Sequence, residues 1–426
     1  DELVDPRPYA EVLRQWSTLH PEFAFLPRKF KIAISGATED RAAIAWHDVG
    51  LQLVKNEAGE IGFKVLVGGG MGRTPITATV IRDFLPWNQI LVYLEAVVRV
   101  YNRYGRRDNA YKARIKILVK AEGQAYFDQV EQEFRQILEN DPDGALHLIP
   151  QAELDRVAAC FVRPAGVEPL AEPVLDAEAP LMYRRWLERN VHAHQVPGWR
   201  AVTLSVKRAG QAPGDATDAQ LDAAADLSDR YSLGELRVTH DQNLVLPWVK
   251  ASDLPALFEA ARAAGYATPN IGLVTDMIAC PGGDFCALAN ARSIPVAEEI
   301  TERLADLDEV FDLGDIDLHI SGCINSCGHH HSGHIGILGV DKDGTEWYQV
   351  TLGGSDGSNH APQALAGKVI GPSFAASEIT DVVEAILDTY RAQRQGGEKF
   401  IDAVHRLGLD PFKTAANAQR TATARA

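Results

Sequence analysis

The amino-acid sequence predicts an α+β fold in which one unit is used twice, with a smaller α+β unit between the two copies. Short motifs recur in the same order near both ends of the chain, and each copy passes from strand-like alternation to helical spacing. The stretch between the copies has strand and helix patterns of its own, so the fold is mixed rather than all-helical. The predicted domains are residues 1–185, a half-domain at 190–269, residues 270–412 and a frayed tail at 413–426.

The repeat has five matching steps. Both copies begin with Ile-Ser-Gly, continue into a second apolar strand and a polar turn, and then into an alternating strand that ends in Gly-Gly. A helical pattern closes each copy. An ordered series of this kind is not expected by chance. The matching segments are 34–36 and 320–322, 49–51 and 335–337, 56–59 and 341–344, 66–69 and 351–354, and 90–101 and 379–390.

The region between the copies divides into a linker and a small unit. Residues 167–180 are rich in proline and acidic side chains, which is typical of a linker. The small unit covers roughly residues 192–270. Its expected strands are 204–206 and 236–238, and its expected helices are 215–229 and 251–264.

Composition excludes several classes of function. The 426 residues carry a net charge of −16, which disfavours non-specific nucleic-acid binding. No apolar run is long enough to span a bilayer and no signal peptide is visible, so we expect no membrane partner. Five cysteines without an export signal indicate a reducing compartment, the cytoplasm, rather than a disulfide framework. Because the first residue is Asp1, we expect the chain to begin partway through a larger protein.

Four cysteines fall in two close pairs. Five residues separate Cys280 from Cys286, and three separate Cys323 from Cys327. Four thiolates can complete either a zinc site or an iron–sulfur cluster. Structural zinc sites usually space paired cysteines by two to four residues, so the longer loop favours an iron–sulfur cluster but leaves zinc open. The fifth cysteine, Cys160, is expected to be a buried structural thiol.

Histidines at positions 329, 330, 331 and 334 follow the second cysteine pair. Such a run can bind metal or protons. The simpler interpretation is preferred for each residue: one or two line the site and the rest lie at the surface. No role is therefore assigned to His329, His330 or His331.

Residues 26–34 alternate as in a strand, with Lys29 and Lys31 on one face and apolar side chains on the other. Two neighbouring ammonium groups repel each other unless an anion lies between them, so the pair suggests a site for an oxyanion or a cofactor carboxylate. Two solvated lysines on an exposed strand are the alternative. At the offset of the repeat the lysines match Asp315 and Asp317, so one copy carries the lysines and the other the thiolates. We expect the anion site and the metal site to face each other.

A glycine-rich loop, Val67-Gly68-Gly69-Gly70-Met71-Gly72, follows a predicted strand. Its amides could bind carboxylates or phosphate, although a structural turn explains it equally well. It is not a dinucleotide fingerprint, because the third glycine is missing at the required spacing. Arg114 and Lys116 alternate on a strand-like stretch and could bind anions, with surface charge as the default interpretation.

Together these residues resemble the siroheme-dependent sulfite and nitrite reductases. The matching features are Cys-x₅-Cys followed by Cys-x₃-Cys, the Leu-Pro-Arg-Lys-Phe-Lys segment, the Val-Gly-Gly-Gly loop and Thr239-His240-Asp241-Gln242-Asn243-Leu244. They occur in family order over nearly the whole chain. The resemblance implies two pseudo-repeated siroheme and iron–sulfur reductase domains and one ferredoxin-like half-domain.

The resemblance also implies roles for individual residues. The four cysteines would hold a 4Fe-4S cluster, with Cys327 bridging to the siroheme iron. Lys29 and Lys31 would bind the anionic substrate and help to supply protons. The residues implied to lie near siroheme are Arg28, Gly68, Gly69, Gly70, Arg114, Lys116, Gln242, Asn243 and Asn325.

The implied activity is the assimilatory six-electron reduction of sulfite to sulfide, with nitrite reduction to ammonia as the close alternative. A cobalamin-pathway relative and a non-redox zinc-binding module are more distant alternatives. Electrons are expected from a ferredoxin or a flavoprotein subunit, because the chain has no nicotinamide or flavin motif. Family members also begin with a half-domain that supplies arginines and that this sequence lacks, so we expect an N-terminal truncation and weakened siroheme binding.

Overall fold

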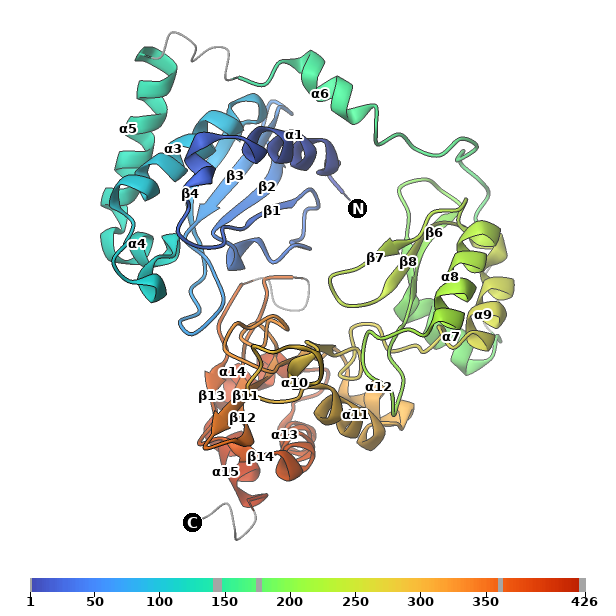
Figure 1. The fold of residues 1–426 in the computed structure, drawn as a ribbon. Helices are drawn as coiled ribbons and strands as arrows, with labels where there is room; N and C mark the ends of the chain where they lie inside the picture. Colours follow the sequence, from blue (N-terminus) through green and yellow to red (C-terminus); the bar gives the residue numbers. More distant parts are fainter. Residues whose placement is uncertain (1, 141–147, 174–177, 359–362, 421–426) are drawn as a thin grey trace. The chain divides into compact units, whose positions relative to one another are not determined.

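The computed structural model describes residues 2–140, 148–173, 178–358 and 363–420. The chain forms two compact units, one of residues 1–163 with 356–364 and the other of residues 164–355 with 365–426. Figure 1 traces the chain through both units. In the part of the chain that the structure describes, no helix is long and apolar enough to cross a membrane.

The first unit is built on a four-stranded sheet in the order β1-β2-β3-β4. Its strands are β1 (Ile32–Ser35), β2 (Val49–Lys55), β3 (Ile61–Val67) and β4 (Thr79–Pro86). Its helices are α1 (Arg7–Thr18), α2 (Pro21–Ala24), α3 (Ile90–Tyr104), α4 (Ile115–Glu122), α5 (Gln124–Asn140) and α6 (Gln151–Ala158). Most side chains of helix α3 are buried. They share one hydrophobic core with the side chains of the sheet, and the helix also packs against α5.

The second unit begins with the small half-domain. Its sheet has the order β5-β6-β8-β7, which places the last strand in sequence between the second and third. The strands are β5 (Val191–Ala193), β6 (Trp199–Leu204), β7 (Arg237–Val238) and β8 (Leu244–Lys250), and the helices are α7 (Leu181–Asn190), α8 (Asp218–Tyr231) and α9 (Leu254–Ala263). The two expected helices are confirmed. The first residue of the expected linker, Val167, is buried with Trp199 and Trp248 of the half-domain, while residues 174–177 of the linker lie outside the described residues.

The second copy of the repeat completes this unit around a six-stranded sheet. Its strands are β9 (Ile278–Ala279), β10 (Leu318–Ser321), β11 (Ile335–Lys342), β12 (Thr345–Leu352), β13 (Lys368–Val369) and β14 (Phe374–Ala375). Its helices are α10 (Gly282–Phe285), α11 (Ile294–Arg303), α12 (Leu307–Leu313), α13 (Ile379–Gln393), α14 (Phe400–Leu407) and α15 (Asp410–Ala418).

The two copies match in strand register. Ile34 pairs in parallel with Leu51, as Ile320 does with Ile337, and an antiparallel hairpin follows in both. The match extends further towards the N-terminus than the sequence predicted. The amides of Leu3 and Val4 donate to the Gly36 carbonyl, as those of Asn290 and Ala291 do to the Gly322 carbonyl, and a helix follows each contact.

The copies differ at the edge of their sheets. In the second copy β9 pairs with β10 in parallel, and Leu318 and Ile320 are fully buried. In the first copy β1 is the edge of the described sheet, and Ile32 and Ile34 are only half-buried. They line a cavity of about 420 Å³ together with Phe30 and one face of α1. This lining confirms the predicted apolar face of residues 30–34.

Three expectations from the sequence are wrong. Arg114 and Lys116 lie at the start of helix α4, not on a strand, because the apolar side chains of Ile115, Leu118 and Val119 form a helical face. Residues 413–418 are helical rather than frayed, since Phe412 and Ala416 are buried, while 421–426 lie outside the described residues. Cys160 is exposed rather than buried.

Candidate cofactor site

The two cysteine pairs follow neighbouring parallel strands. Cys280 comes directly after β9, and Cys323 comes two residues after β10. Because β9 and β10 run in parallel, with Ala279 opposite Ile320, their carboxyl ends meet at the same edge of the sheet. The topology therefore brings together two segments that are more than thirty residues apart in sequence.

Direct contacts join the two cysteine loops. The amide of Gly322 donates to Cys280 Sγ over 3.1 Å, and the Gly322 carbonyl accepts from the amides of Asn290 and Ala291. Cys280 Sγ also lies 3.5 Å from Ser293 Oγ. An amide that points at sulfur stabilises a thiolate, which is the form that binds metal. This donor set fits a cluster held by thiolates.

The four thiols are not equally accessible. Cys323 is buried, Cys280 and Cys286 are half-buried, and Cys327 is exposed. Among the described residues no three His, Cys, Asp or Glu side chains are gathered closely enough to hold a single metal ion.

Gly322 is the point of closest approach between the loops. A Cβ there would lie 2.6 Å from the Ala291 carbonyl oxygen and 2.8 Å from Gly282 Cα, which are backbone atoms that cannot easily move. We expect Gly322→Ala to push the loops apart and to lower cluster uptake several-fold, as iron and acid-labile sulfide analysis would show. Gly396→Ala is the matched control, because a Cβ there meets no atom within 4 Å. Equal uptake by the two variants would contradict this prediction.

The histidine run is more buried than the sequence predicted. His330 and His334 are fully buried, and His329 and His331 are half-buried, so none of the four is fully exposed. His330 Nδ1 lies 3.1 Å from Ser326 Oγ, while its Nε2 has no hydrogen-bond partner. Burial lowers the pKa of His330 to about 2, and His331 adds to the effect. The His330 ring is therefore neutral, and it contacts the second cysteine loop through Ser326. Asn325 in the same loop is exposed.

In the first unit the predicted lysines lie just before β1 rather than within it. Lys29 is exposed and Lys31 is half-buried. The Lys31 amide donates to Asp48 Oδ2 over 3.0 Å, and the amide of Val49 donates to the Lys31 carbonyl. Asp48 is buried, and its Oδ1 accepts from Arg114 Nη2 over 2.7 Å. Arg28 is exposed.

A buried lysine side chain holds the glycine loop by hydrogen bonds to backbone carbonyls. Lys116 is buried, and its Nζ donates to the carbonyls of Met71 over 2.8 Å and Thr74 over 2.6 Å. Burial lowers the pKa of Lys116 to about 8. The amides of Gly68 and Gly70 donate to backbone carbonyls, so they do not form the open anion cradle that the sequence suggested. Lys116 is a structural cation here rather than surface charge.

The pKa of His47 depends in part on the charge of Lys31. Burial, together with the charge of the nearby Lys31 ammonium, lowers the pKa of His47 to about 4. Between pH 6.5 and 4 the unfolded chain binds a proton at this site that the folded chain does not. Stability should therefore fall as pH falls through this window, by up to about 3 kcal/mol from His47. Urea unfolding at pH 7 and pH 4.5 should show a smaller loss for His47→Gln, and an equal loss would refute the assignment.

Gln242 and Asn243 are both engaged by the protein itself. They lie in the turn before β8, not in a strand, and Gln242 has a left-handed φ of 60°. The Gln242 side chain bonds both backbone groups of Ala279, and Asn243 Nδ2 donates to Asp276 Oδ1 over 2.9 Å. Lys207 and Asp276 form a buried ion pair beside them that was not predicted from the sequence. The sequence signal that could have indicated it is a lysine that directly follows the expected strand Leu204-Ser205-Val206.

Two family profiles match most of the chain. The family profile described as the nitrite and sulphite reductase 4Fe-4S domain matches residues 1–138 and 273–423. The profile of the nitrite/sulfite reductase ferredoxin-like half domain matches residues 194–264. The two matched parts of the first profile correspond to the two copies of the repeat.

Individual relatives are similar over nearly the whole chain. "Sulfite reductase [ferredoxin] 1" of Mycolicibacterium paratuberculosis is 28% identical over 94% of this chain and 66% of its own length. The chloroplastic ferredoxin–nitrite reductase of Arabidopsis thaliana is 27% identical over 91% of this chain and 61% of its own length. The structure of NirA from Mycobacterium tuberculosis superposes with a TM-score of 0.72 at 27% identity, covering 97% of this chain and 69% of that one. The chain thus spans about two thirds of the length of these proteins.

Proposed function

Because this chain belongs to the nitrite and sulphite reductase 4Fe-4S domain family, we propose that it catalyses the six-electron reduction of sulfite to sulfide at a siroheme coupled to a 4Fe-4S cluster. The observation that carries the proposal is the meeting of the two cysteine loops, where the Gly322 amide donates to Cys280 Sγ. Cys280, Cys286, Cys323 and Cys327 would hold the cluster.

The chain's own contribution to the reaction is binding, charge and protons. When bound, the siroheme and cluster would supply electrons one at a time. Lys29 and Lys31, which lie two residues apart before β1, would hold the oxyanion by their ammonium groups and give up protons from Nζ to the oxygen atoms that leave as water. Placing positive charge beside the anion makes each addition of an electron less costly.

The half-buried position of Lys31 suits this role. Its ammonium lies close enough to His47 to lower the pKa of that ring. His47 therefore stays neutral at physiological pH and adds no positive charge to those of the two lysines. Asp48 accepts hydrogen bonds from the Lys31 backbone amide and from Arg114, and so fixes the start of β1.

The nearest alternative substrate is nitrite. Relatives named as ferredoxin-dependent nitrite reductases, from Arabidopsis thaliana and Haloferax mediterranei, are each 27% identical to this chain. Their similarity is close to that of the sulfite reductases, at 28%. The names of both groups include ferredoxin, which favours a ferredoxin as the electron donor of this chain over a flavoprotein subunit. We further propose the cytoplasm as its compartment, because four reduced thiols are needed.

The test is an anaerobic visible absorption spectrum of the chain purified from cells that make siroheme, followed by turnover with reduced ferredoxin. Siroheme bands that shift with sulfite, and faster turnover of sulfite than nitrite, are expected. Preference for nitrite would replace sulfite as the substrate. A colourless protein that contains zinc would overturn the redox function altogether.

A further inference from the structure

Ala279 lies one residue before the first of the four cysteines. Its backbone amide and carbonyl both form hydrogen bonds with a side chain of the half-domain. Strand β9 is the last strand of its sheet. The Cys280 amide donates to Ile320 on β10, so the groups of Ala279 point the other way. Gln242 Oε1 accepts from the Ala279 amide over 2.9 Å, and Gln242 Nε2 donates to the Ala279 carbonyl over 2.8 Å. One amide side chain thus stands where a further strand would pair.

The turn that carries Gln242 is rigid. Gln242 adopts a left-handed φ of 60°, a conformation that costs about 1 kcal/mol or more outside glycine and needs support from its surroundings. Thr239 supplies that support: its amide donates to the Asn243 carbonyl over 2.9 Å, and its Oγ1 accepts from the Asn243 amide over 3.0 Å. The turn therefore presents the Gln242 amide in one orientation.

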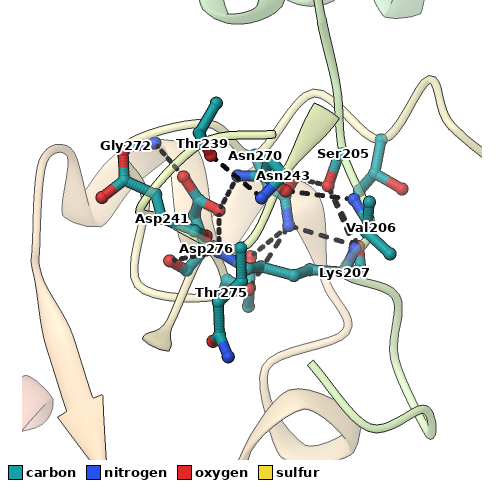
Figure 2. Close-up of polar contacts among 12 residues, drawn as sticks. Ser205, Val206, Lys207, Thr239, Asp241, Asn243, Asn270, Gly272, Thr275 and Asp276 are labelled. Carbon is teal, nitrogen blue, oxygen red and sulfur yellow. Dashed lines mark hydrogen bonds and ion pairs between the residues drawn. The ribbon is translucent and has the colours of Figure 1, made fainter. Parts of the chain in front are cut away.

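A buried ion pair anchors the same turn to the segment that leads into β9 (Figure 2). The Lys207 side chain is fully buried, and its Nζ lies 2.6 Å from Asp276 Oδ1 and also donates to the Asp241 carbonyl. Asp276 Oδ1 accepts from Asn243, and its Oδ2 accepts from the Gly272 amide over 3.0 Å. Removing two charges from water is costly, so a pair like this commonly serves to fix a geometry rather than to add stability.

We propose that this clamp, made of Gln242, Lys207 and Asp276, lets the ferredoxin-like half-domain set the position of Cys280 and thereby the reduction potential of the cluster. The inference rests on the proposed function. Cys280 Sγ receives its hydrogen bond from Gly322, and that bond depends on where the end of β9 lies. Hydrogen bonds to sulfur favour the more negative, reduced state of a cluster. Loosening the clamp should weaken that bond and make the cluster harder to reduce.

The test compares Gln242→Leu with Gln211→Leu, the same change at an exposed glutamine of the same half-domain. After anaerobic reconstitution of each full chain, iron and acid-labile sulfide are counted and the cluster is titrated by redox potential. For Gln242→Leu we expect the ratio of reduced to oxidised cluster at the wild-type midpoint to fall about tenfold, which is about 59 mV for one electron. Gln211→Leu should match the wild type.

Two further variants separate positioning from folding. Gln242→Gly relieves the left-handed strain but still removes the amide, so it should shift the potential in the same direction as Gln242→Leu. Lys207→Met with Asp276→Asn removes both charges together and leaves no unpaired buried ion. In the cluster-free chain, hydrogen exchange at the Ala279 amide should be faster in both glutamine variants.

The outcomes distinguish this inference from the proposed function. A wild-type chain that takes up no cluster overturns both. A wild-type chain that takes up the cluster, with the same potential and the same Ala279 exchange in Gln242→Leu, overturns the inference alone. A lower potential together with faster exchange supports it.

Discussion

Cys323→Ser is expected to remove the 4Fe-4S cluster, with iron and acid-labile sulfide falling at least tenfold. Cys323 is the buried member of the four, and its loop closes on the first pair through Gly322. A serine hydroxyl is a harder and weaker ligand than a thiolate, so the site loses one of four bonds that a cluster needs.

The fifth cysteine provides the matched control. Cys160 is exposed and lies in the other unit of the chain. Cys160→Ser should keep full iron and sulfide content, because no cluster ligand is lost. If both variants retain the cluster, Cys323 is not a ligand. If both lose it, the loss reflects general instability and not ligation.

Lys31→Met is expected to lower kcat/KM for sulfite by about 100-fold, a typical cost of removing one group that stabilises developing negative charge. The methionine keeps the unbranched shape of the side chain, one atom shorter, and leaves the residue 31 backbone amide in place, so the bond to Asp48 and the start of β1 should persist. Cluster and siroheme content should be unchanged. Lys55→Met, at the exposed end of β2, is the control and should keep wild-type kinetics.

A second measurement does not depend on turnover. Burial and the Lys31 ammonium together lower the pKa of His47 to about 4. Removing that charge should raise the pKa of His47 towards its ordinary value, which NMR titration of the His47 ring would detect. An unchanged His47 pKa would place the ammonium elsewhere, and unchanged kinetics would remove Lys31 from the proposed reaction.

Much of the fold follows from local sequence. The helical spacing at 90–101 and 379–390 predicted α3 and α13, which run three residues further in each case. The turn at 341–344 lies in the β11–β12 hairpin, as predicted. These elements can be predicted because each buries one face, and this gives their apolar side chains a regular spacing along the sequence. The short strand-like stretch at Arg114 failed, because a few alternating residues fit a helix start equally well.

The sequence by itself determined the repeat, the mixed architecture and the two closely spaced pairs of cysteines, because each of these is a pattern of residues that lie near one another in the chain. Only the tertiary structure decided what the buried charges do. Lys116 holds a loop by its carbonyls, and Lys207 pairs with Asp276, which lies 69 residues further along the chain. A buried charge must find a partner wherever the fold brings one. The residues next to a lysine in the sequence do not indicate that partner, so the sequence could not predict the role of either lysine.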